Sequence, residues 1–327
     1  MSTTVSGGRS SGDGPSPGSG GPQAPLGGNF LRPSSRRVGE RVVLAGLATS
    51  ALLSVLVTVG IVVSLVLPAV SFWREISIVE FFTGTRWTPT FADPDYGVLP
   101  LITGTLWTTA IGLAVAVPLG LAAAMYLSEY ANPRVRRIVK PVLEVLAGIP
   151  SVVLGYFAVT FFAPDLLRGL LGIGVGAYSV LAAGIVLGVF IVPVIASLAE
   201  DAMTAVPDAL RQGSAALGAN RMSTTLKVVF PAALSGIVAA VVLGVSRAIG
   251  ETMILAIAAG GRAQMVDSPL LEGQTMTGFI AQTATGENAP GSLAYNTLFA
   301  VGLTLFAMTL LINFVSIRLV RRFREAY

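Results

Sequence analysis

The hydrophobic positions of the chain fall into six long apolar runs separated by polar segments. A helix that crosses a bilayer core of about 30 Å needs roughly 20 consecutive apolar residues. Each run is long enough, so the pattern predicts an all-α polytopic membrane protein with six transmembrane helices. The runs cover approximately Val42–Val70, Leu99–Leu127, Ile138–Phe162, Tyr178–Leu198, Phe230–Ala259 and Leu293–Leu319.

Composition supports this class. Hydrophobic residues make up 53% of the 327 residues, charged residues only 12%, and the mean hydropathy is +0.77. A soluble domain usually carries about 25% charged residues. Most of the chain therefore has no water-facing surface to cover.

The net charge of +4 does not indicate a nucleic-acid partner, because the basic residues follow the alternation of the loops between the apolar runs. Basic residues concentrate in alternate connections, as the positive-inside rule requires, and this predicts that both termini are cytoplasmic. The cytoplasmic set is Arg32, Arg36, Arg37, Arg41, Arg134, Arg136, Arg137, Lys140, Arg211, Arg221, Lys227, Arg318, Arg321, Arg322 and Arg324. The external set is Arg74, Arg86, Arg168 and Arg262.

The missing residue types exclude several chemistries. The chain has no Cys and no His, so thiol nucleophiles, disulfides, imidazole bases and His-ligated metal sites are not expected. It also has no G-x-x-x-x-G-K-[ST] run for binding ATP in P-loop fashion. We expect neither enzymatic activity, nor a metal, nor a cofactor in this chain.

The chain divides into four expected parts. Residues 1–38 are rich in Gly, Ser and Pro and predict a disordered cytoplasmic tail. Residues 39–98 hold the first transmembrane helix and an external loop, residues 99–320 form the main transmembrane domain, and residues 321–327 are a basic cytoplasmic tail.

A cytoplasmic stretch from Gln212 to Pro231 separates the fourth and fifth runs, with a short helix expected near 204–221. Pro207 suits a first helical turn, and Asp208 suits the positive end of the helix dipole. Gly218 stands where a left-handed cap would end the helix, and Ser223 and Thr224 offer a new N-cap. Two interpretations stay open: an ordinary amphipathic loop helix, or a docking element.

Charged residues within the apolar runs mark a candidate pathway. Arg247 and Glu251 are four residues apart in the fifth run, so we expect them to share a helix face and pair. In the third run, Glu144 precedes Pro150, which should kink the helix and free the carbonyl of Leu146. Buried charges at membrane depth are costly and usually functional, although a purely structural ion triad is the alternative.

The stretch that ends at Pro231 resembles the coupling signature of binding-protein-dependent ABC importers. That signature is Glu-Ala-Ala, three residues, Gly, nine residues, then Ile-x-Leu-Pro. Gly218, Val228, Phe230 and Pro231 keep its spacing, whereas Gln212-Gly213-Ser214 stand in place of Glu-Ala-Ala. The resemblance implies an ATPase-coupling role for Asp208, Gln212, Gly213, Ser214, Gly218 and Pro231.

Three further segments resemble the PstC family of phosphate-specific permeases: LPLITGTLWTTAIGLAVAVPLGLAAAMYLSEY, LEVLAGIPSVVLGYF and SRAIGETM. The resemblance covers roughly residues 87–321. It implies the MetI-like architecture of a type I ABC importer in the bacterial inner membrane. The substrate pathway it implies uses Arg247, Glu251 and Glu144. Expected partners are a PstA-like second permease subunit, a PstB-like ATPase dimer that binds ATP and Mg²⁺, and an external PstS-like phosphate-binding protein.

Three alternatives remain beside a phosphate permease. The first is a membrane-embedded enzyme or assembly scaffold, which the lack of His, Cys and clustered acidic residues disfavours. A permease for another oxyanion, sulfate or molybdate, would use Arg247 equally well. An ion-coupled secondary transporter could also use an Arg–Glu pair, but that class usually shows inverted repeats or interrupted helices, and no internal repeat is evident.

Overall fold

The computed structural model describes residues 36–286 and 289–323. The predicted tail before residue 36 and the last four residues of the predicted basic tail lie outside the described residues. The chain divides into two units, Met1–Thr58 and Val59–Tyr327. In the first unit the described part is the beginning of helix α1, an apolar helical segment with exposed side chains.

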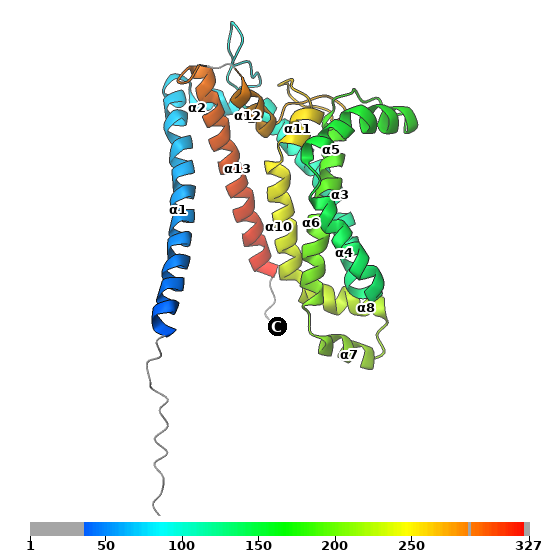
Figure 1. The fold of residues 1–327 in the computed structure, drawn as a ribbon. Helices are drawn as coiled ribbons and strands as arrows, with labels where there is room; N and C mark the ends of the chain where they lie inside the picture. The colour runs from blue at the N-terminus through cyan, green and yellow to red at the C-terminus, as the bar shows by residue number, and fades with distance from the viewer. Residues whose placement is uncertain (1–35, 287–288, 324–327) are drawn as a thin grey trace, which may run out of the picture. The chain divides into compact units, whose positions relative to one another are not determined.

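The described chain is almost entirely helical (Figure 1). The only bridge between extended residues in this part joins Trp87 to Tyr96. The α-helices are α1 (Arg36–Glu75), α2 (Ile78–Thr83), α3 (Leu99–Met125), α4 (Pro133–Ala147), α5 (Ser151–Phe157), α6 (Val180–Thr204), α7 (Asp208–Ala216), α8 (Arg221–Thr224), α9 (Phe230–Ala232), α10 (Leu234–Gly250), α11 (Met253–Ala258), α12 (Met276–Thr285) and α13 (Leu293–Phe323). Three π-helical segments are η1 (Tyr126–Tyr130), η2 (Ala158–Leu170) and η3 (Thr225–Val229).

Five helical segments are long and apolar enough to cross a membrane, and a bent pair makes a sixth. The five are Gly39–Glu75, Leu99–Tyr130, Ser151–Leu170, Val180–Thr204 and Leu293–Arg318. The bent pair is Arg221–Ala232 with Leu234–Gly250, at 73° to each other. The predicted all-α, polytopic fold class is confirmed. The cytoplasmic placement of the termini stays a prediction.

Helix α6 is the centre of the second unit, because α3, α4 and α10 all pack against it. Glycines let the backbones of α3 and α6 approach closely. A Cβ atom added at Gly188 would lie 2.7 Å from the carbonyl oxygen of Gly112, and one at Gly120 would lie 2.9 Å from the Cβ of Ile195. Small residues at such crossings replace side-chain interdigitation by backbone contact.

Helix α10 meets α6 through a row of small residues. Ala240 and Ala248 are buried, and a Cβ atom at Gly244 would lie 2.8 Å from the Cδ1 of Ile195. Gly236 faces Ala202 with even less room. Gly236, Ala240, Gly244 and Ala248 recur every four residues, and this row of small residues forms the contact of α10 with α6.

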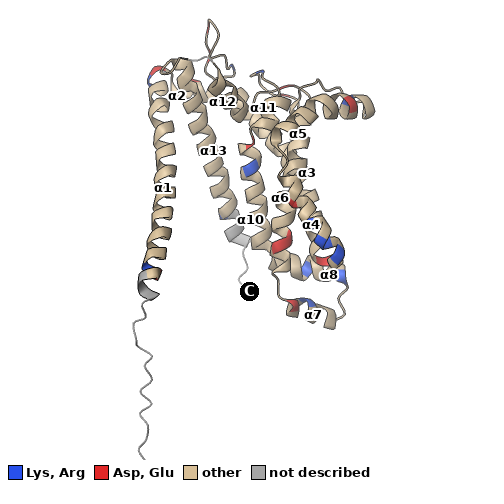
Figure 2. Ribbon diagram, in the orientation of Figure 1, with Lys and Arg blue, Asp and Glu red and all other residues tan. Residues whose placement is uncertain are grey.

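Charged residues lie mainly at the two ends of the helices, and the middles are apolar (Figure 2). One end of the second unit carries α7 and α8, and we call it the α7 end. The other end carries α2, α11 and α12. There, aromatic side chains form a buried cluster in which the ring centroids of Trp87 and Phe279 are 5.0 Å apart, edge to face.

The third apolar run is not one kinked helix. Helix α4 ends at Ala147 and α5 begins at Ser151, so the candidate span starts later than predicted and includes η2. Proline cannot continue a helix without losing a hydrogen bond, and here the chain breaks before Pro150 instead of bending. The N–H of Ile149 donates to the carbonyl of Leu146 at 3.3 Å, so the expectation of a free carbonyl there is wrong.

Candidate coupling site and substrate pathway

A helix lies where the cytoplasmic stretch predicts one. Pro207 is the N-cap of α7, Asp208 is its first residue, and Gly218 adopts a φ of +79° just beyond its end. That left-handed conformation favours glycine and lets the chain reverse. The predicted N-cap of the next helix is wrong, because the side chain of Asn220, not Ser223 or Thr224, caps α8 by accepting from the N–H of Ser223 at 2.8 Å.

One face of α7 is exposed, and the other face is hydrogen-bonded to the rest of the loop. Gln212 and Gly213 are exposed, and a Cβ atom at Gly213 would meet nothing within 4 Å. Ser214 points inward and shares a 2.8 Å hydrogen bond with Thr224 of α8. Leu217, just after the helix, is 91% exposed. A segment outside the candidate membrane spans thus presents small and apolar groups on its open side.

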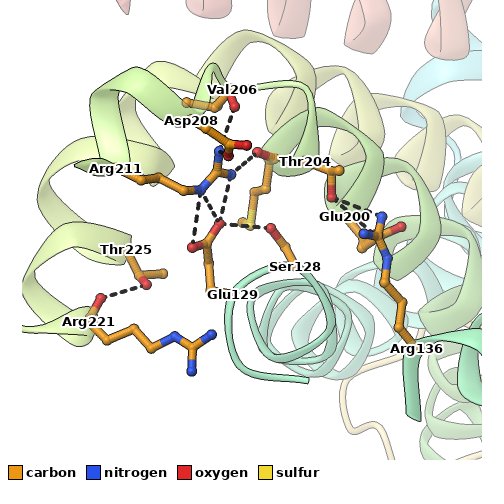
Figure 3. A network of polar contacts seen from close by, with 11 residues as sticks. Ser128, Glu129, Arg136, Glu200, Thr204, Val206, Asp208, Arg211, Arg221 and Thr225 are labelled. Carbon is orange, nitrogen blue, oxygen red and sulfur yellow. Dashed lines mark hydrogen bonds and ion pairs between the residues drawn. The ribbon is translucent and has the colours of Figure 1, made fainter. Parts of the chain in front are cut away.

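Arg211 joins α7 to the ends of two transmembrane helices (Figure 3). Its Nη2 donates to the Oε1 of Glu129 at 2.9 Å and to the carbonyl of Met203 at 2.8 Å. Its Nη1 donates to the carbonyl of Val206 and to Asp208. The hydrogen bonds to Glu129 raise the pKa of the Arg211 guanidinium above its usual value. One side chain therefore connects α7, the π-helical end of α3 and the end of α6.

A second ion cluster lies beside the first. Glu200 of α6 is fully buried and pairs with Arg136 and with Lys140 of α4, the latter at 2.7 Å. Lys140 also binds Asp201, and Thr204 donates to Glu200 at 3.1 Å. Burial alone would lower the pKa of the Lys140 ammonium, but its hydrogen bonds to Asp201 and Glu200 outweigh burial and raise it. This cluster fixes α4 against the end of α6.

Glu129 and Glu200 are absent from the sequence-based candidates. Glu129 is 7% exposed and Glu200 0%, so both are more deeply buried than the acidic residues that the sequence singles out. Each follows the end of an apolar run by two residues, where hydropathy treats it as loop. Their signal in the sequence is an acidic residue beside a span end, opposite basic residues in the neighbouring connections.

The predicted pair of Arg247 and Glu251 does not form. Helix α10 ends at Gly250, and Glu251 is extended, with φ −66° and ψ 130°. Thr277 donates to the carbonyl of Glu251 at 2.8 Å and takes the place of a helical hydrogen bond. In residues 36–286 and 289–323, neither Arg247 nor Glu251 takes part in an ion pair.

Arg247 lies against an aromatic ring instead. Its Cζ is 4.6 Å from the ring centroid of Phe190, a buried residue of α6. Stacking on a ring face fixes a guanidinium while its N–H edges stay available. The side chain is exposed in the single chain, at the far end of α10 from α7.

Glu144 lies elsewhere, so the triad with Arg247 and Glu251 is wrong as well. It is an exposed residue of α4 and lines a cavity of about 450 Å³ that also includes Arg136, Arg137 and Lys140. This cavity belongs to the α7 end, because it continues onto Leu127 and Ser128 of η1.

The described residues contain no group of three or more acidic side chains that could hold a metal ion. The candidate site therefore has two features, a mechanical connection and a positive charge. A surface helix is fastened by charge-assisted hydrogen bonds to the ends of membrane helices, and a single arginine lies at the far end of α10.

Comparisons with known proteins identify the fold. Solved structures with a similar fold include a permease of the MetNI methionine ABC transporter, with a TM-score of 0.51 and 24% identity over 70% of this chain and 95% of that one. A chain of a bacterial alginate ABC transporter gives a TM-score of 0.60 and 14% identity over 88% and 97%. The fold is that of MetI-type ABC importer permeases.

Sequence relatives narrow the class. The family model described as "Binding-protein-dependent transport system inner membrane component" matches residues 116–326. A probable ABC transporter permease, YqgH of Bacillus subtilis, is 40% identical over 74% of this chain and 79% of its own length. Phosphate transport system permease PstC 1 of Mycobacterium tuberculosis is 36% identical over 75% and 82%. The chain belongs to the binding-protein-dependent permease family and is a multi-pass inner-membrane protein.

Proposed function

We propose that this chain is one permease subunit of an ATP-driven importer of inorganic phosphate. Relatives named as phosphate permeases support the substrate, among them PstC of Haemophilus influenzae, which is 30% identical over 85% of this chain. The partners would be a second permease subunit, a cytoplasmic ATPase dimer that binds ATP and Mg²⁺, and an external phosphate-binding protein. Both termini would be cytoplasmic, and the ATPase, not this chain, would be the enzyme.

The observation that carries the coupling role is the fastening of α7 by Arg211. The open side of α7, with Gln212, Gly213 and Leu217, is the surface that the ATPase would grip. Its inner side is bound through Arg211 to Glu129. A displacement of α7 is thereby passed to α3 and α6 without a flexible linker. Asp208, Ser214, Gly218 and Pro231 shape this loop.

Arg247 is the residue that we assign to the substrate pathway. Planar guanidinium donors match phosphate oxygens bidentately and keep their charge at any physiological pH. Glu251 stands at the helix break next to it and would repel the anion, which favours weak binding and release. Glu144 is better assigned to the cavity on α4 than to the pathway.

The test is uptake by the reconstituted complex in proteoliposomes, with phosphate, sulfate or molybdate and with or without ATP. We expect ATP-dependent uptake of phosphate and stimulation of ATP hydrolysis by the phosphate-loaded binding protein. Uptake powered by an ion gradient alone would overturn the class of mechanism. Stimulation by sulfate or molybdate alone would overturn the substrate.

A substitution then tests the pathway residue. Arg247→Lys keeps the charge but loses the planar pair of guanidinium donors, so we expect reduced phosphate uptake from a complex that still assembles. Arg318→Lys, at the exposed end of α13, is the matched control. Normal uptake by Arg247→Lys would remove Arg247 from the pathway.

A further inference from the structure

The cavity on α4 is a built feature that the coupling function does not use. It occupies about 450 Å³ between η1 and the first three turns of α4. Its polar lining consists of Ser128, Arg136, Arg137, Lys140 and Glu144. Arg136 and Lys140 are engaged with Glu200, but Arg137 is exposed and forms no ion pair within the described part of the chain. The lining therefore keeps a cationic group available.

An apolar strip runs along α4 next to the cavity. Ile138 is 66% exposed, Val142 50% and Val145 73%. Residues four and three apart share one helix face, so these three form a continuous stripe. Pro141, on the border between the two faces, lines the cavity. Basic and apolar surfaces thus meet along one edge of a single helix.

The cavity lies at the end of a candidate membrane span. The candidate span Leu99–Tyr130 ends at the cavity, and Tyr126 and Tyr130 on its last turns are both exposed. Exposed tyrosines are enriched at the headgroup level of bilayers. A ligand in the cavity would have its polar part at this level and any hydrocarbon part along the strip.

We propose that this cavity binds the headgroup of an anionic phospholipid, with an acyl chain lying along Ile138, Val142 and Val145. Arg137 supplies the available charge for the phosphate. Glu144, about 10 Å further along the helix, accepts hydrogen bonds from headgroup hydroxyls, as phosphatidylglycerol would offer. The adjoining apolar strip is the reason to choose a lipid over free phosphate, which needs no hydrocarbon surface.

The experiment uses the full chain purified with its co-expressed partner subunits, in nanodiscs of phosphatidylcholine with or without phosphatidylglycerol. Retained phosphatidylglycerol is counted by native mass spectrometry. We expect selective retention, about fivefold weaker in Arg137→Gln, since one basic residue near an anionic surface contributes about that factor. Val145→Ser should also weaken retention, because the strip loses apolar area. Arg134→Gln is the matched control, on the same helix but outside the cavity, and should retain lipid like the unaltered chain.

Three results would overturn the proposal. One is equal retention of phosphatidylcholine and phosphatidylglycerol, and another is an equal loss in Arg134→Gln and Arg137→Gln, which would indicate only general surface charge. The third is displacement of the lipid by millimolar inorganic phosphate together with no effect of Val145→Ser, which would make this a soluble-anion site.

Discussion

Helix α6 is held in two different ways along its length. Its middle meets α3 and α10 at glycines and alanines, where backbone atoms and the side chain of Ile195 lie close to the neighbouring helix. Its end meets α4, η1 and α7 through Glu200 and through carbonyl groups that bind Arg211. Close packing of small residues determines the contacts of the middle of α6, and ion pairs determine the contacts of its end.

The difference separates what must stay rigid from what can respond. Close-packed interiors resist displacement, because any shift costs many contacts at once. Ion pairs at a partly hydrated end can lengthen, exchange partners or be pulled by another protein at lower cost. We therefore expect substitutions in the middle of α6 to prevent folding. Substitutions at its end should weaken the link between α7 and the transmembrane helices.

The largest effect is expected from Gly188→Val in the middle of α6. The new side chain would collide with the carbonyl of Gly112, which belongs to the backbone and cannot move aside. Overpacking of this kind costs about 3 kcal/mol, enough to prevent stable insertion. The measurement is the yield and melting temperature of detergent-solubilised protein.

Gly60→Val is its control, because a Cβ atom at Gly60 of α1 meets nothing within 4 Å. If Gly188→Val melts at the same temperature as Gly60→Val, the contact between α3 and α6 is looser than the distance between Gly188 and Gly112 implies.

Glu200→Gln should have the next largest effect. It leaves Arg136 and Lys140 without their buried carboxylate, at a cost of about 2 kcal/mol after allowance for their partial exposure. The melting temperature should fall while the folded complex still forms. Asp201→Asn, which removes only the exposed partner of Lys140, should change it much less. Equal losses in both variants would place the stability in surface charge, not in the buried pair.

Arg211→Met should lower the melting temperature, because it leaves the mostly buried Glu129 without its cation, but the complex should still assemble and should lose transport. We expect uptake to fall about tenfold while basal ATP hydrolysis persists, because a charge-assisted contact is typically worth about 1.5–3 kcal/mol. Glu129→Gln should act alike, and the double variant should be no worse than either single one, since both remove one interaction. Lys227→Met, an exposed cation of the same loop, is the control. Additive losses in the double variant would contradict a shared link.

The smallest effect is expected from Asn220→Ala. It removes the side-chain cap of α8, worth about 1 kcal/mol, from the loop alone. Local hydrogen exchange at residues 221–224 should increase without a change in global melting temperature. The same substitution at Asn132, which caps α4, should loosen α4 instead. A global loss of stability would show that the loop is part of the core.

The class of fold could be predicted from the sequence because apolar runs of this length are rarely anything but transmembrane helices. Helix α7 could be predicted too, since Asp208 and Gly218 act through local backbone chemistry. The break at Pro150 could be predicted only as a kink, because the presence of a proline does not show whether a helix bends or ends. The break at Glu251 could not be predicted, because a distant threonine replaces a helical hydrogen bond there. Spacing along a sequence cannot reveal a donor that arrives from Thr277.

The polar network was not predicted for a similar reason. Glu129 and Arg211 are 82 residues apart, and neither has an unusual neighbour in the sequence. Only the folded chain shows that the two acidic residues at the span ends, Glu129 and Glu200, are the buried ones. Glu144 lies inside an apolar run and was expected to be buried there, yet it is exposed.

The 73° bend that precedes α10 makes this helix a lever arm. Arg247 stands 13 residues beyond Leu234, which is about 20 Å along the axis. A rotation of only about 10° at the bend would swing its guanidinium through roughly 3 Å, the length of one N–H···O hydrogen bond. Since α10 packs against α6 through Ala240, Gly244 and Ala248, the two helices would turn together, and under the proposed function the angle at Ala233 would set how far an anion held by Arg247 is carried.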